Sequence, residues 1–446
     1  MSNVITRRAV LTGATALAGG AYAKSYAAML PSSSKSFPRD FIWGVSAAGH
    51  QVEGNDTASD YWVMENVKPT LFRERAGDAC DSYHRFEEDI TLIRSCGLGA
   101  YRFSIEWSRI EPNKGSFSVA EMDYYKRVID ACHRNNVRPA PTFHHNVSPA
   151  WFAGEGGWTN SESPKLFARY CDYVAKAVAG DIDMAFTINE PDVNGVVKWF
   201  PGMAQMMKQM TSGAQSPLAL MNAAAAKAIG SDQFSGLLFA PNELVTPNLI
   251  EAHHQGFAAI KAAKSALPVG VPLSVFEYRA VGANSQVDAA YKEVLGPWLE
   301  AGKRSGDFIG VQNYGVVFVD STGPVTPKDH KGTNPFETDP ASLGATVRYV
   351  HQMTSKPIVV SENGMDTTDD QERIRYIDLA LAGLQSAISD GVPVQGYFHW
   401  SLLDNFEWLS GYVPKFGLFS VDHQTFKRTP KPSAHHLGDI ARRNSL

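Results

Sequence analysis

From about residue 37 onward, short apolar runs alternate with longer amphipathic stretches. The apolar runs predict eight β-strands, at residues 41–45, 100–105, 138–143, 184–188, 273–276, 308–311, 358–360 and 394–398. Between them, helical periodicity predicts helices at residues 82–96, 119–135, 164–179, 217–229, 246–266, 288–301, 342–353 and 369–389. A segment rich in glycine, proline and aspartate, residues 320–340, is predicted to be one long loop after the sixth strand.

The strict alternation of strand and helix indicates an α/β fold with parallel strands joined by crossover helices. Eight such units close into a (β/α)8 TIM barrel, which we predict as a single domain. An open, doubly wound sheet is the alternative. It is disfavoured because no GxGxxG or GxxxxGK[ST] loop follows the first predicted strand.

Composition and charge narrow the class of protein. The chain has 446 residues, 44% of them hydrophobic and 20% charged, so it can bury a large core. A formal net charge of −5 gives no electrostatic reason to expect nucleic acid or an anionic membrane as a partner. We therefore expect neither, and the sequence does not indicate an oligomeric state.

The first residues are interpreted as an export signal rather than as part of the fold. Arg7 and Arg8 form a twin-arginine pattern, an apolar stretch follows, and residues 21–23 read Ala-Tyr-Ala. The stretch is too short to span a bilayer comfortably, so cleavage is favoured over anchoring. Residues 1–28 are thus predicted to be a twin-arginine signal peptide and residues 29–446 the barrel domain, with a periplasmic or secreted location. A disordered tail is the alternative.

The four cysteines do not form a recognisable metal or redox motif. They are Cys80, Cys96, Cys132 and Cys171, and none of them has CxxC spacing. Buried free thiols are the favoured interpretation, and a disulfide is the minority alternative. A substrate of twin-arginine export folds in the reducing cytoplasm, which also favours free thiols.

Two glutamates end two of the apolar runs. Glu190 precedes Pro191, and Glu362 precedes Asn363 and Gly364. Either one alone would ordinarily be a solvated strand-end residue. In a closed barrel, however, the carboxyl ends of the strands converge over one opening. Two carboxyl groups that face each other there are the minimal equipment for cleaving a glycosidic bond.

Other strand ends carry amides, imidazoles and indoles. A sugar offers hydroxyls along its edge and a weakly polarised C–H face, so it is bound by polar side chains around an aromatic platform. The residues in question are Gln51, His144, His145, Asn189, Gln312, Asn313, Tyr314, Trp400, Glu407 and Trp408. This set fits a pyranose, and we expect a small-molecule carbohydrate as the substrate. No further ligand cluster accompanies the two histidines, so neither a metal nor a cofactor is expected.

Six motifs occur in a characteristic order along the chain. They lie at residues 41–54 (FIWG to QVEG), 101–109 (YRFSI to WSR), 189–191 (NEP), 361–364 (SENG), 400–408 (WSLLDNFEW) and 415–418 (KFGL). On these motifs the chain resembles the family-one glycoside hydrolases, the β-glucosidase and β-galactosidase group. The resemblance extends over essentially the whole length after the leader.

The resemblance implies a role for each matching position. Glu190 is expected to be the general acid/base and Glu362 the nucleophile of a retaining double displacement. Arg102 and Tyr314 are expected beside the nucleophile, where they would keep its pKa low. The residues expected to bind the first sugar are Gln51, His145, Asn189, Trp400 as the platform, Glu407, Trp408 and Phe416.

Three positions depart from the family pattern. Asn146 replaces a usual tryptophan, Gln312 an asparagine, and Asn313 the first of a tyrosine pair. These changes leave open whether glucose, galactose, fucose or xylose is preferred. Glu407 followed by Trp408 indicates an unphosphorylated sugar, because a carboxylate would repel a phosphate.

The resulting functional prediction is a retaining, exo-acting β-glycosidase similar to β-glucosidases. One alternative is a transglycosylase that uses the same glycosyl-enzyme intermediate. The other is an inactive sugar-binding relative, which the presence of both glutamates disfavours.

Overall fold

The computed structural model describes residues 36–237, 240–328, 330 and 335–446. These residues belong to the compact unit Lys35–Leu446. The predicted signal peptide, residues 1–28, lies outside the described residues.

Eight parallel strands close into a barrel in the order β1-β11-β10-β7-β5-β4-β3-β2. Their bounds are β1 (Ile42–Ser46), β2 (Ala100–Ser104), β3 (Arg138–His144), β4 (Ala185–Ile188), β5 (Val269–Ser274), β7 (Phe308–Asn313), β10 (Ile358–Asn363) and β11 (Val394–Trp400). The first strand pairs with both β2 and the last barrel strand, β11, which closes the sheet. The predicted (β/α)8 fold is therefore confirmed, and the open sheet is excluded.

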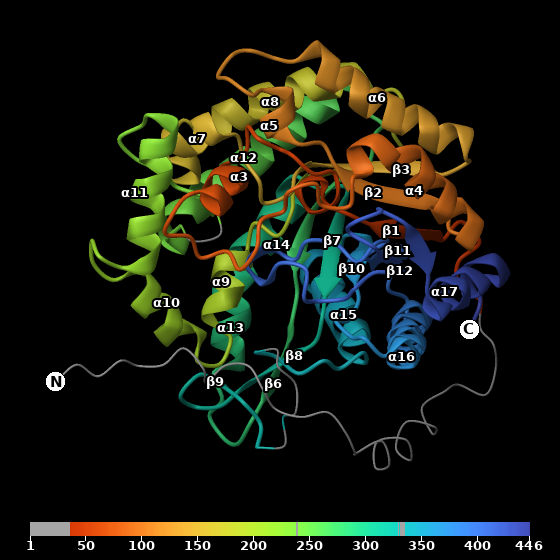
Figure 1. Cartoon of the computed structure of the whole chain (residues 1–446). Helices are drawn as coiled ribbons and strands as arrows, with labels where there is room; N and C mark the ends of the chain where they lie inside the picture. The colour runs from red at the N-terminus through yellow and green to blue at the C-terminus, as the bar shows by residue number, and fades with distance from the viewer. Residues whose placement is uncertain (1–35, 238–239, 329, 331–334) are drawn as a thin grey trace. The chain divides into compact units, whose positions relative to one another are not determined.

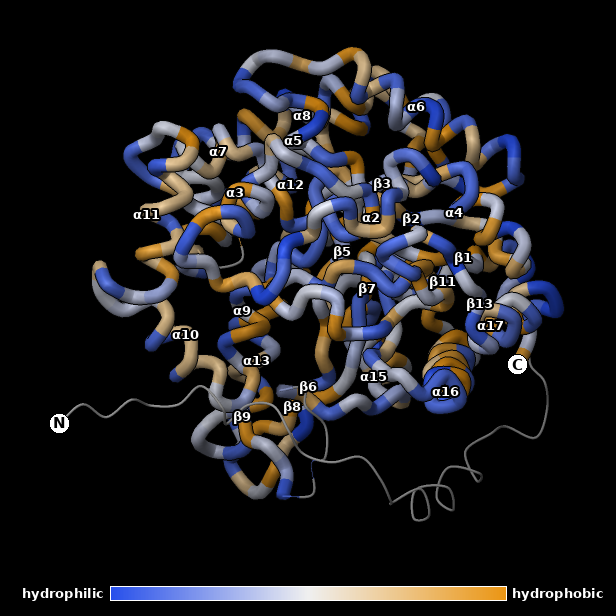
Figure 2. Tube along the Cα trace, in the orientation of Figure 1, coloured by the Kyte–Doolittle hydropathy of each residue, from blue (hydrophilic) through white to orange (hydrophobic). Residues whose placement is uncertain are grey.

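Helices pack around the outside of the barrel, as Figure 1 shows. The longer ones are α4 (Ser82–Cys96), α6 (Val119–Arg134), α8 (Ser163–Val178), α11 (Pro217–Ile229), α12 (Asn242–Ala263), α15 (Ser342–Thr354), α16 (Asp370–Ser389) and α17 (Pro432–Arg443). Because helices cover the strands, the strands read as nearly continuous apolar runs rather than as alternating ones. In Figure 2 the helix α16 carries both hydrophobic and hydrophilic positions, as expected for a helix with one buried face.

The barrel interior is filled by side chains rather than open. A separate buried cluster joins residues from several strands, namely Ala100, Ala140, Met184, Phe186, Phe308, Val359 and Phe398. Inward-pointing side chains of this kind form the layers that close a TIM barrel core. The chemistry must therefore lie at the ends of the strands.

The fifth strand differs from the prediction. The sequence pattern placed it at residues 273–276, whereas β5 spans Val269–Ser274. The strand contains Gly270 and Pro272, which ordinarily weaken a strand assignment. Gly270 is required here because a Cβ at that position would lie 2.4 Å from a ring carbon of Phe308.

One predicted helix is in fact two. The pattern at residues 288–301 splits into α13 (Val287–Val294) and α14 (Gly296–Arg304). The break falls before Pro297, which lacks an N–H to continue the first helix and suits the first turn of the next.

The segment at residues 320–340 is not wholly a loop. Within it, β9 (Pro324–Val325) pairs antiparallel with β8 (Val316–Val319), and β8 pairs with β6 (Glu277–Ala280). This small sheet is built from the connections that follow β5 and β7. Residues 329 and 331–334 of the segment lie outside the described residues.

The connections also contain short helices that the sequence pattern did not predict. They are α2 (Gly49–Val52), α3 (Asp60–Asn66), α5 (Trp107–Ile110), α7 (Ala150–Gly154), α9 (Val193–Lys198) and α10 (Met203–Thr211). A two-stranded sheet, β12 (Phe419–Val421) with β13 (Arg428–Pro430), precedes α17. Short elements of this kind are too brief for periodicity to reveal.

All four cysteines are buried and unpaired, as the spacing predicted. Burial raises the pKa of each thiol above its ordinary value. Among the described helices, none has the length and apolar character needed to cross a membrane.

Candidate active site

Glu362 lies near the carboxyl end of β10, and its carboxylate accepts hydrogen bonds from three side chains. Arg102 Nη1 donates to Oε1 at 2.5 Å and Gln312 Nε2 donates to the same oxygen at 2.9 Å. The Tyr314 hydroxyl donates to Oε2 at 2.6 Å. Three separate parts of the barrel, β2, β7 and the residue after β7, therefore hold this one carboxylate.

The pKa of Glu362 is raised above its ordinary value. Burial of the carboxylate is the largest cause, while Arg102 and Tyr314 both lower the pKa. The prediction that these two neighbours keep the pKa low is therefore wrong in its net direction. Each contact lowers the pKa as expected. The side chain of Glu362 is only 4% exposed, however, and its removal from water raises the pKa by more than the two contacts lower it.

Arg102 is fully buried and links the carboxylate to a second polar side chain. Its Nη2 donates to Asn189 Oδ1, and its guanidinium lies 4.9 Å from the ring centroid of Phe186. Gln312 Nε2 also donates to Asn189 Oδ1, at 2.7 Å. The amide of Asn189 is thereby oriented, with its oxygen toward the two donors.

His145 is held in one tautomer by this arrangement. Asn189 Nδ2 can only donate, and it lies 3.0 Å from His145 Nε2, so Nε2 accepts and Nδ1 carries the proton. Burial lowers the pKa of His145 well below 6.5, so the ring is neutral. Its Nδ1 has no hydrogen-bond partner within the described part of the chain. A neutral N–H donor is therefore left for a ligand.

Glu190 lies just beyond the end of β4, after Asn189, and its environment differs from that of Glu362. Its backbone has a φ of 41°, in the left-handed region, and its N–H donates to the carbonyl of Pro272 at 2.9 Å. Burial raises the pKa of Glu190 well above its ordinary value, and the charge of Glu362 raises it further. Glu362 forms an ion pair with Arg102, whereas Glu190 forms none among the described residues, so Glu190 retains the proton when one of the two ionises.

Two indole rings and an imidazole lie together beside these groups. The ring of His145 stacks on Trp400 with centroids 5.8 Å apart, and on Trp408 at 6.1 Å. Trp400 Nε1 donates to Glu407 Oε1 at 3.3 Å. Phe416 lies edge-on to the Tyr314 ring, with centroids 6.0 Å apart. The arrangement offers flat apolar surface next to polar atoms, as a sugar requires.

Gln51 and Glu407 form a polar pair at the same end of the barrel. Gln51 Nε2 donates to the carbonyl of Phe406 at 2.8 Å and lies 3.4 Å from Glu407 Oε2. The Oε1 atom of Gln51 is buried and, among the described residues, has no partner. Burial raises the pKa of Glu407 to about 8, with the charge of Glu362 also raising it.

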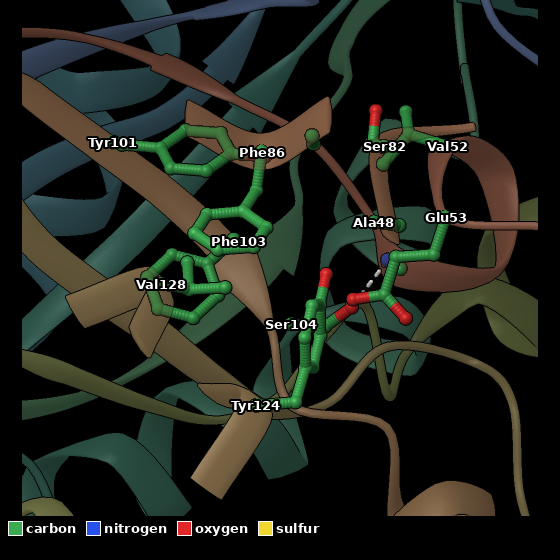
Figure 3. A pocket seen from close by; sticks show the side chains of 12 residues that line it. Ala48, Val52, Glu53, Ser82, Phe86, Tyr101, Phe103, Ser104, Tyr124 and Val128 are labelled. Carbon is green, nitrogen blue, oxygen red and sulfur yellow. Dashed lines mark hydrogen bonds between the residues drawn. The ribbon is translucent and has the colours of Figure 1, made fainter. Parts of the chain in front are cut away.

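Gln51 is carried on α2, which is anchored from behind. The N–H of Gly49 donates to Ser104 Oγ at 2.7 Å, and Arg109 Nε donates to Glu53 Oε2 at 2.8 Å. Figure 3 shows Glu53 and Ser104 lining a pocket between α2, β2, α4 and α6. Its volume of about 20 Å³ has room for a single water molecule and not for a sugar.

Glycine is required where the ends of two site strands approach each other. A Cβ on Gly364 would lie 2.1 Å from the carbonyl oxygen of Trp400. Only glycine allows this contact, which brings the residues after Glu362 against the end of β11. The same holds for Gly417, where a Cβ would lie 2.1 Å from the backbone nitrogen of Asp404.

Two of the rim residues singled out from the sequence face other partners. Asn313 Nδ2 donates to the carbonyl of Val275 at 2.9 Å, and its Oδ1 accepts from Ser342 Oγ at 2.7 Å. Its amide therefore holds neighbouring segments of the chain together and does not face a ligand. His144 Nε2 pairs with Ser148 Oγ at 2.9 Å, and burial lowers its pKa to about 3. Within the described ranges, no group of three or more His, Cys, Asp or Glu residues is arranged to hold a metal ion.

Gln312 is the contact that sequence reasoning missed. The sequence placed it among the strand-end residues and as a departure from the family pattern but assigned it no contact, yet it donates to both Glu362 and Asn189. The signal that could have identified it is its place in the barrel, because Gln312 on β7 is the direct register partner of Glu362 on β10. Asn146, the other departure, has a φ of 63° and is buried, and its Oδ1 has no partner in the described ranges.

Comparison with known proteins gives a consistent result. The profile of the family described as Glycosyl hydrolase family 1 matches residues 33–234 and 309–446. The chain is 28% identical to β-glucosidase A of Acetivibrio thermocellus, over 92% of this chain and 99% of that protein. It is 30% identical to the 1,4-β-D-glucan glucohydrolase of Thermotoga neapolitana, again over 92% and 99%.

Solved structures show the same similarity. The apo structure of a β-glucosidase 1317 is 41% identical with a TM-score of 0.86, covering 90% of this chain and 98% of that one. The crystal structure of β-glycosidase BGL167 is 40% identical with a TM-score of 0.85, covering 92% and 98%.

Proposed function

Because the chain belongs to glycosyl hydrolase family 1 and is a glycoside hydrolase, we propose that it is a retaining, exo-acting β-glycosidase. It removes the non-reducing terminal sugar from unphosphorylated β-glycosides or oligosaccharides by double displacement. The observation that carries this proposal is the pairing of Glu362, held by Arg102 and Tyr314, with a proton-holding Glu190.

In the first step, the carboxylate of Glu362 attacks the anomeric carbon while Glu190 gives its proton to the glycosidic oxygen. The bond from the anomeric carbon to that oxygen breaks, the aglycone leaves as an alcohol, and a glycosyl ester forms. The hydrogen bonds of Arg102 and Tyr314 stabilise the ionised form of Glu362 against its burial. Burial of the Glu190 carboxyl favours the protonated form that this step needs.

In the second step, Glu190 acts as a base. Once Glu362 is an ester, the negative charge that raises the pKa of Glu190 is gone, so that pKa falls. Glu190 then takes a proton from water, the water oxygen attacks the anomeric carbon, and Glu362 leaves as a carboxylate. Two displacements at the same carbon restore its configuration.

The unpartnered atoms at the rim supply the sugar contacts. Gln51 Oε1 is an acceptor and His145 Nδ1–H a donor, and both are buried without a partner among the described residues. Glu407 offers carboxylate oxygens beside Trp400, whose ring forms the platform. The β-glucosidase names of the relatives make β-glucosides the first substrates to test.

Glu407 also supports the choice of an unphosphorylated sugar. Its carboxyl group is buried and contacts the neutral side chains of Gln51 and Trp400, and it has no ion-pair partner among the described residues. A phosphate at that position would meet a carboxylate instead of a basic group, which is unfavourable.

The location follows from the first residues and stays a separate proposal. Residues 1–28, with Arg7 and Arg8, direct export by the twin-arginine route. Replacing both arginines with lysine should retain the protein in the cytoplasm of a bacterial host. Periplasmic recovery of that variant at the level of the parent chain would contradict the proposal.

The decisive experiment uses Glu362→Ala with an activated aryl β-glucoside. Turnover should be lost, and azide should restore it with a product of inverted configuration, because azide enters the space of the missing nucleophile. Near-normal activity of Glu362→Ala without azide would refute the assignment. Glu190→Ala is the companion variant, and it should lose most activity on substrates with poor leaving groups and little on those with good ones.

The same intermediate can pass its sugar to an alcohol or to another sugar instead of to water. Product analysis with an added acceptor separates these outcomes. A product dominated by glycosyl transfer at low acceptor concentration would identify the protein as a transglycosylase. An inactive sugar-binding relative would show no turnover of any glycoside by the wild-type chain.

A further inference from the structure

A third carboxyl group lies in the turn that carries Glu190. Asp192 is only 1% exposed, and its Oδ1 accepts a hydrogen bond from the backbone N–H of Ser274 at 3.1 Å. Its other oxygen, Oδ2, is buried without a partner in the part of the chain that the structure describes. The reaction steps described above use neither atom.

The turn needs to be held, because Glu190 adopts an unfavourable backbone conformation. Its φ of 41° lies in the left-handed region, which residues with a Cβ avoid. Such a conformation persists only where the surrounding structure imposes it. The placement of the Glu190 carboxyl therefore depends on what fixes this turn.

Two hydrogen bonds fix the turn to the carboxyl end of β5. The Glu190 N–H donates to the carbonyl of Pro272 at 2.9 Å, and Asp192 accepts from Ser274, two residues further along the same strand. The carbonyl of Asp192 also accepts the N–H groups of Gly195 and Val196, which start α9. Asp192 thus joins the turn on one side to β5 and on the other to the following helix.

We propose that Asp192 is a positioning residue for the general acid: it pins the Glu190 turn to the end of β5, and its negative charge helps to keep the proton on Glu190. This inference rests on the proposed role of Glu190. It adds a third carboxyl group to the pair that performs the chemistry.

The polar and charged neighbours of Glu190 come from three barrel strands, from the residue after β7 and from the turn itself. Burial raises its pKa most, followed by the charge of Glu362 on β10 and then that of Asp192. The side chain of Ser274 on β5 and Arg102 on β2 lower it. Tyr314, after β7, also lies close enough to feel the charge of Glu190.

Asp192 itself titrates near neutrality. Burial raises its pKa to about 7, and the N–H of Ser274 acts in the opposite direction. Its charge also raises the pKa of Tyr278, whose hydroxyl lacks a partner within the described residues. The position of Asp192 beside Glu190, and not its titration alone, is what links it to the acid.

The test compares Asp192→Asn with the wild-type enzyme in the dependence of kcat/KM on pH. The asparagine keeps an acceptor for the Ser274 N–H and removes the charge. We expect the alkaline limb, where Glu190 loses its proton, to move to lower pH by about half a pH unit or more, with thermal unfolding unchanged. An unmoved alkaline limb, or one moved to higher pH, overturns the proposal.

Two controls make the direction of the shift specific. Ser274→Ala keeps the backbone donor but removes the side-chain group that lowers the pKa of Glu190, so its alkaline limb should move to higher pH. Asp172→Asn removes one charge from an exposed pair with Lys176 and should leave the profile unchanged. A shift in the Asp172 variant equal to that of Asp192→Asn would overturn the proposal.

The pinning role is tested with Asp192→Ala, which removes both the acceptor and the charge. Its kcat should fall several-fold more on substrates with poor leaving groups than on those with good ones, since only the former need the acid. Equal losses on both substrate types would show a merely structural role. If Glu362→Ala and Glu190→Ala behave as expected while the Asp192 variants do not, only this inference fails and the proposed function stands.

Discussion

Arg102 Nη1 lies 2.5 Å from Glu362 Oε1, and both side chains are almost completely buried. A carboxylate taken out of water and paired with a guanidinium is stable only while the partner remains. Here the pair also carries the nucleophile of the proposed reaction, so the same contact serves stability and chemistry. Removing the cation should therefore affect both, in measurable and separable ways.

Arg102→Met should raise the pKa of Glu362, because Arg102 lowers it in the wild type. The acidic limb of kcat/KM against pH should then move to higher pH, and activity at neutral pH should fall steeply. Leaving one buried partner alone should also cost about 3–5 kcal/mol of unfolding free energy, measurable with urea. Arg102→Lys retains a charge and should shift the limb less. An acidic limb that stays in place in Arg102→Met would contradict the assigned contact.

The hydroxyl of Tyr314 makes the other short contact to Glu362, at 2.6 Å. Tyr314→Phe removes only that donor. A hydrogen bond to a charged group contributes about 1.5–3 kcal/mol, which corresponds to a loss of about 10- to 150-fold in kcat/KM. Because the hydroxyl lowers the pKa of Glu362, the acidic limb should also move to higher pH. A variant with unchanged rate and profile would show that the hydroxyl is dispensable.

Glu407 is predicted to bind sugar hydroxyls most strongly when ionised. Its pKa is raised to about 8, so below that value the protonated form dominates in the free enzyme and above it the carboxylate does. KM for an aryl β-glucoside should therefore fall as the pH rises through about 8. Glu407→Gln resembles the protonated form and cannot ionise, so its KM should no longer depend on pH. The substitution should change kcat less than it changes KM. A KM that still depends on pH in the variant would assign the titration to another group.

Much of the site was predictable because it depends on strand ends. Glu190, Asn189 and Glu362 each end a recognisable apolar run, and in a closed barrel such ends meet regardless of the details of the loops. The net direction of the Glu362 pKa was not predictable from the partners alone. It depends on how completely the surrounding chain removes solvent, which is a property of the assembled fold.

The errors in the fold have a common physical origin. At Gly270 and Pro272 in β5, close packing and backbone contacts with neighbouring strands override the local propensity of the residues. In the small sheet, β6 pairs with β8 across about 40 residues, whereas β9 has only two residues and pairs with the nearby β8. No local pattern encodes the first pairing, and a two-residue strand shows no periodicity, so the segment at 320–340 reads as a loop.

Behind the sugar site, three carboxyl groups share one buried region. Glu106 lies near Asp56 and Glu53, and among the described residues Arg109 forms an ion pair with Glu53 but with neither of the other two. Burial, followed by the charges of Asp56 and Glu53, raises the pKa of Glu106 to about 8. The Ser104 hydroxyl, which also anchors α2, donates to Glu106 Oε1. This region should make the stability of the fold depend on pH.

The sign of that dependence follows from the two pKa values of Glu106, about 4.5 in the unfolded chain and about 8 in the folded protein. Between them the folded chain keeps a proton that the unfolded chain has released, so the free energy of unfolding falls as the pH rises. For one such group the slope approaches about 1.4 kcal/mol per pH unit. Glu106→Gln has no carboxyl proton to lose and keeps an acceptor for Ser104. Its unfolding free energy, measured with urea between pH 5 and 8, should therefore fall less steeply with pH than that of the wild type. In the control Glu300→Gln, at an exposed position, the unfolding free energy should fall with pH as it does in the wild type. If the slope of Glu106→Gln equalled the slopes of both, Glu106 would be ionised in the folded protein.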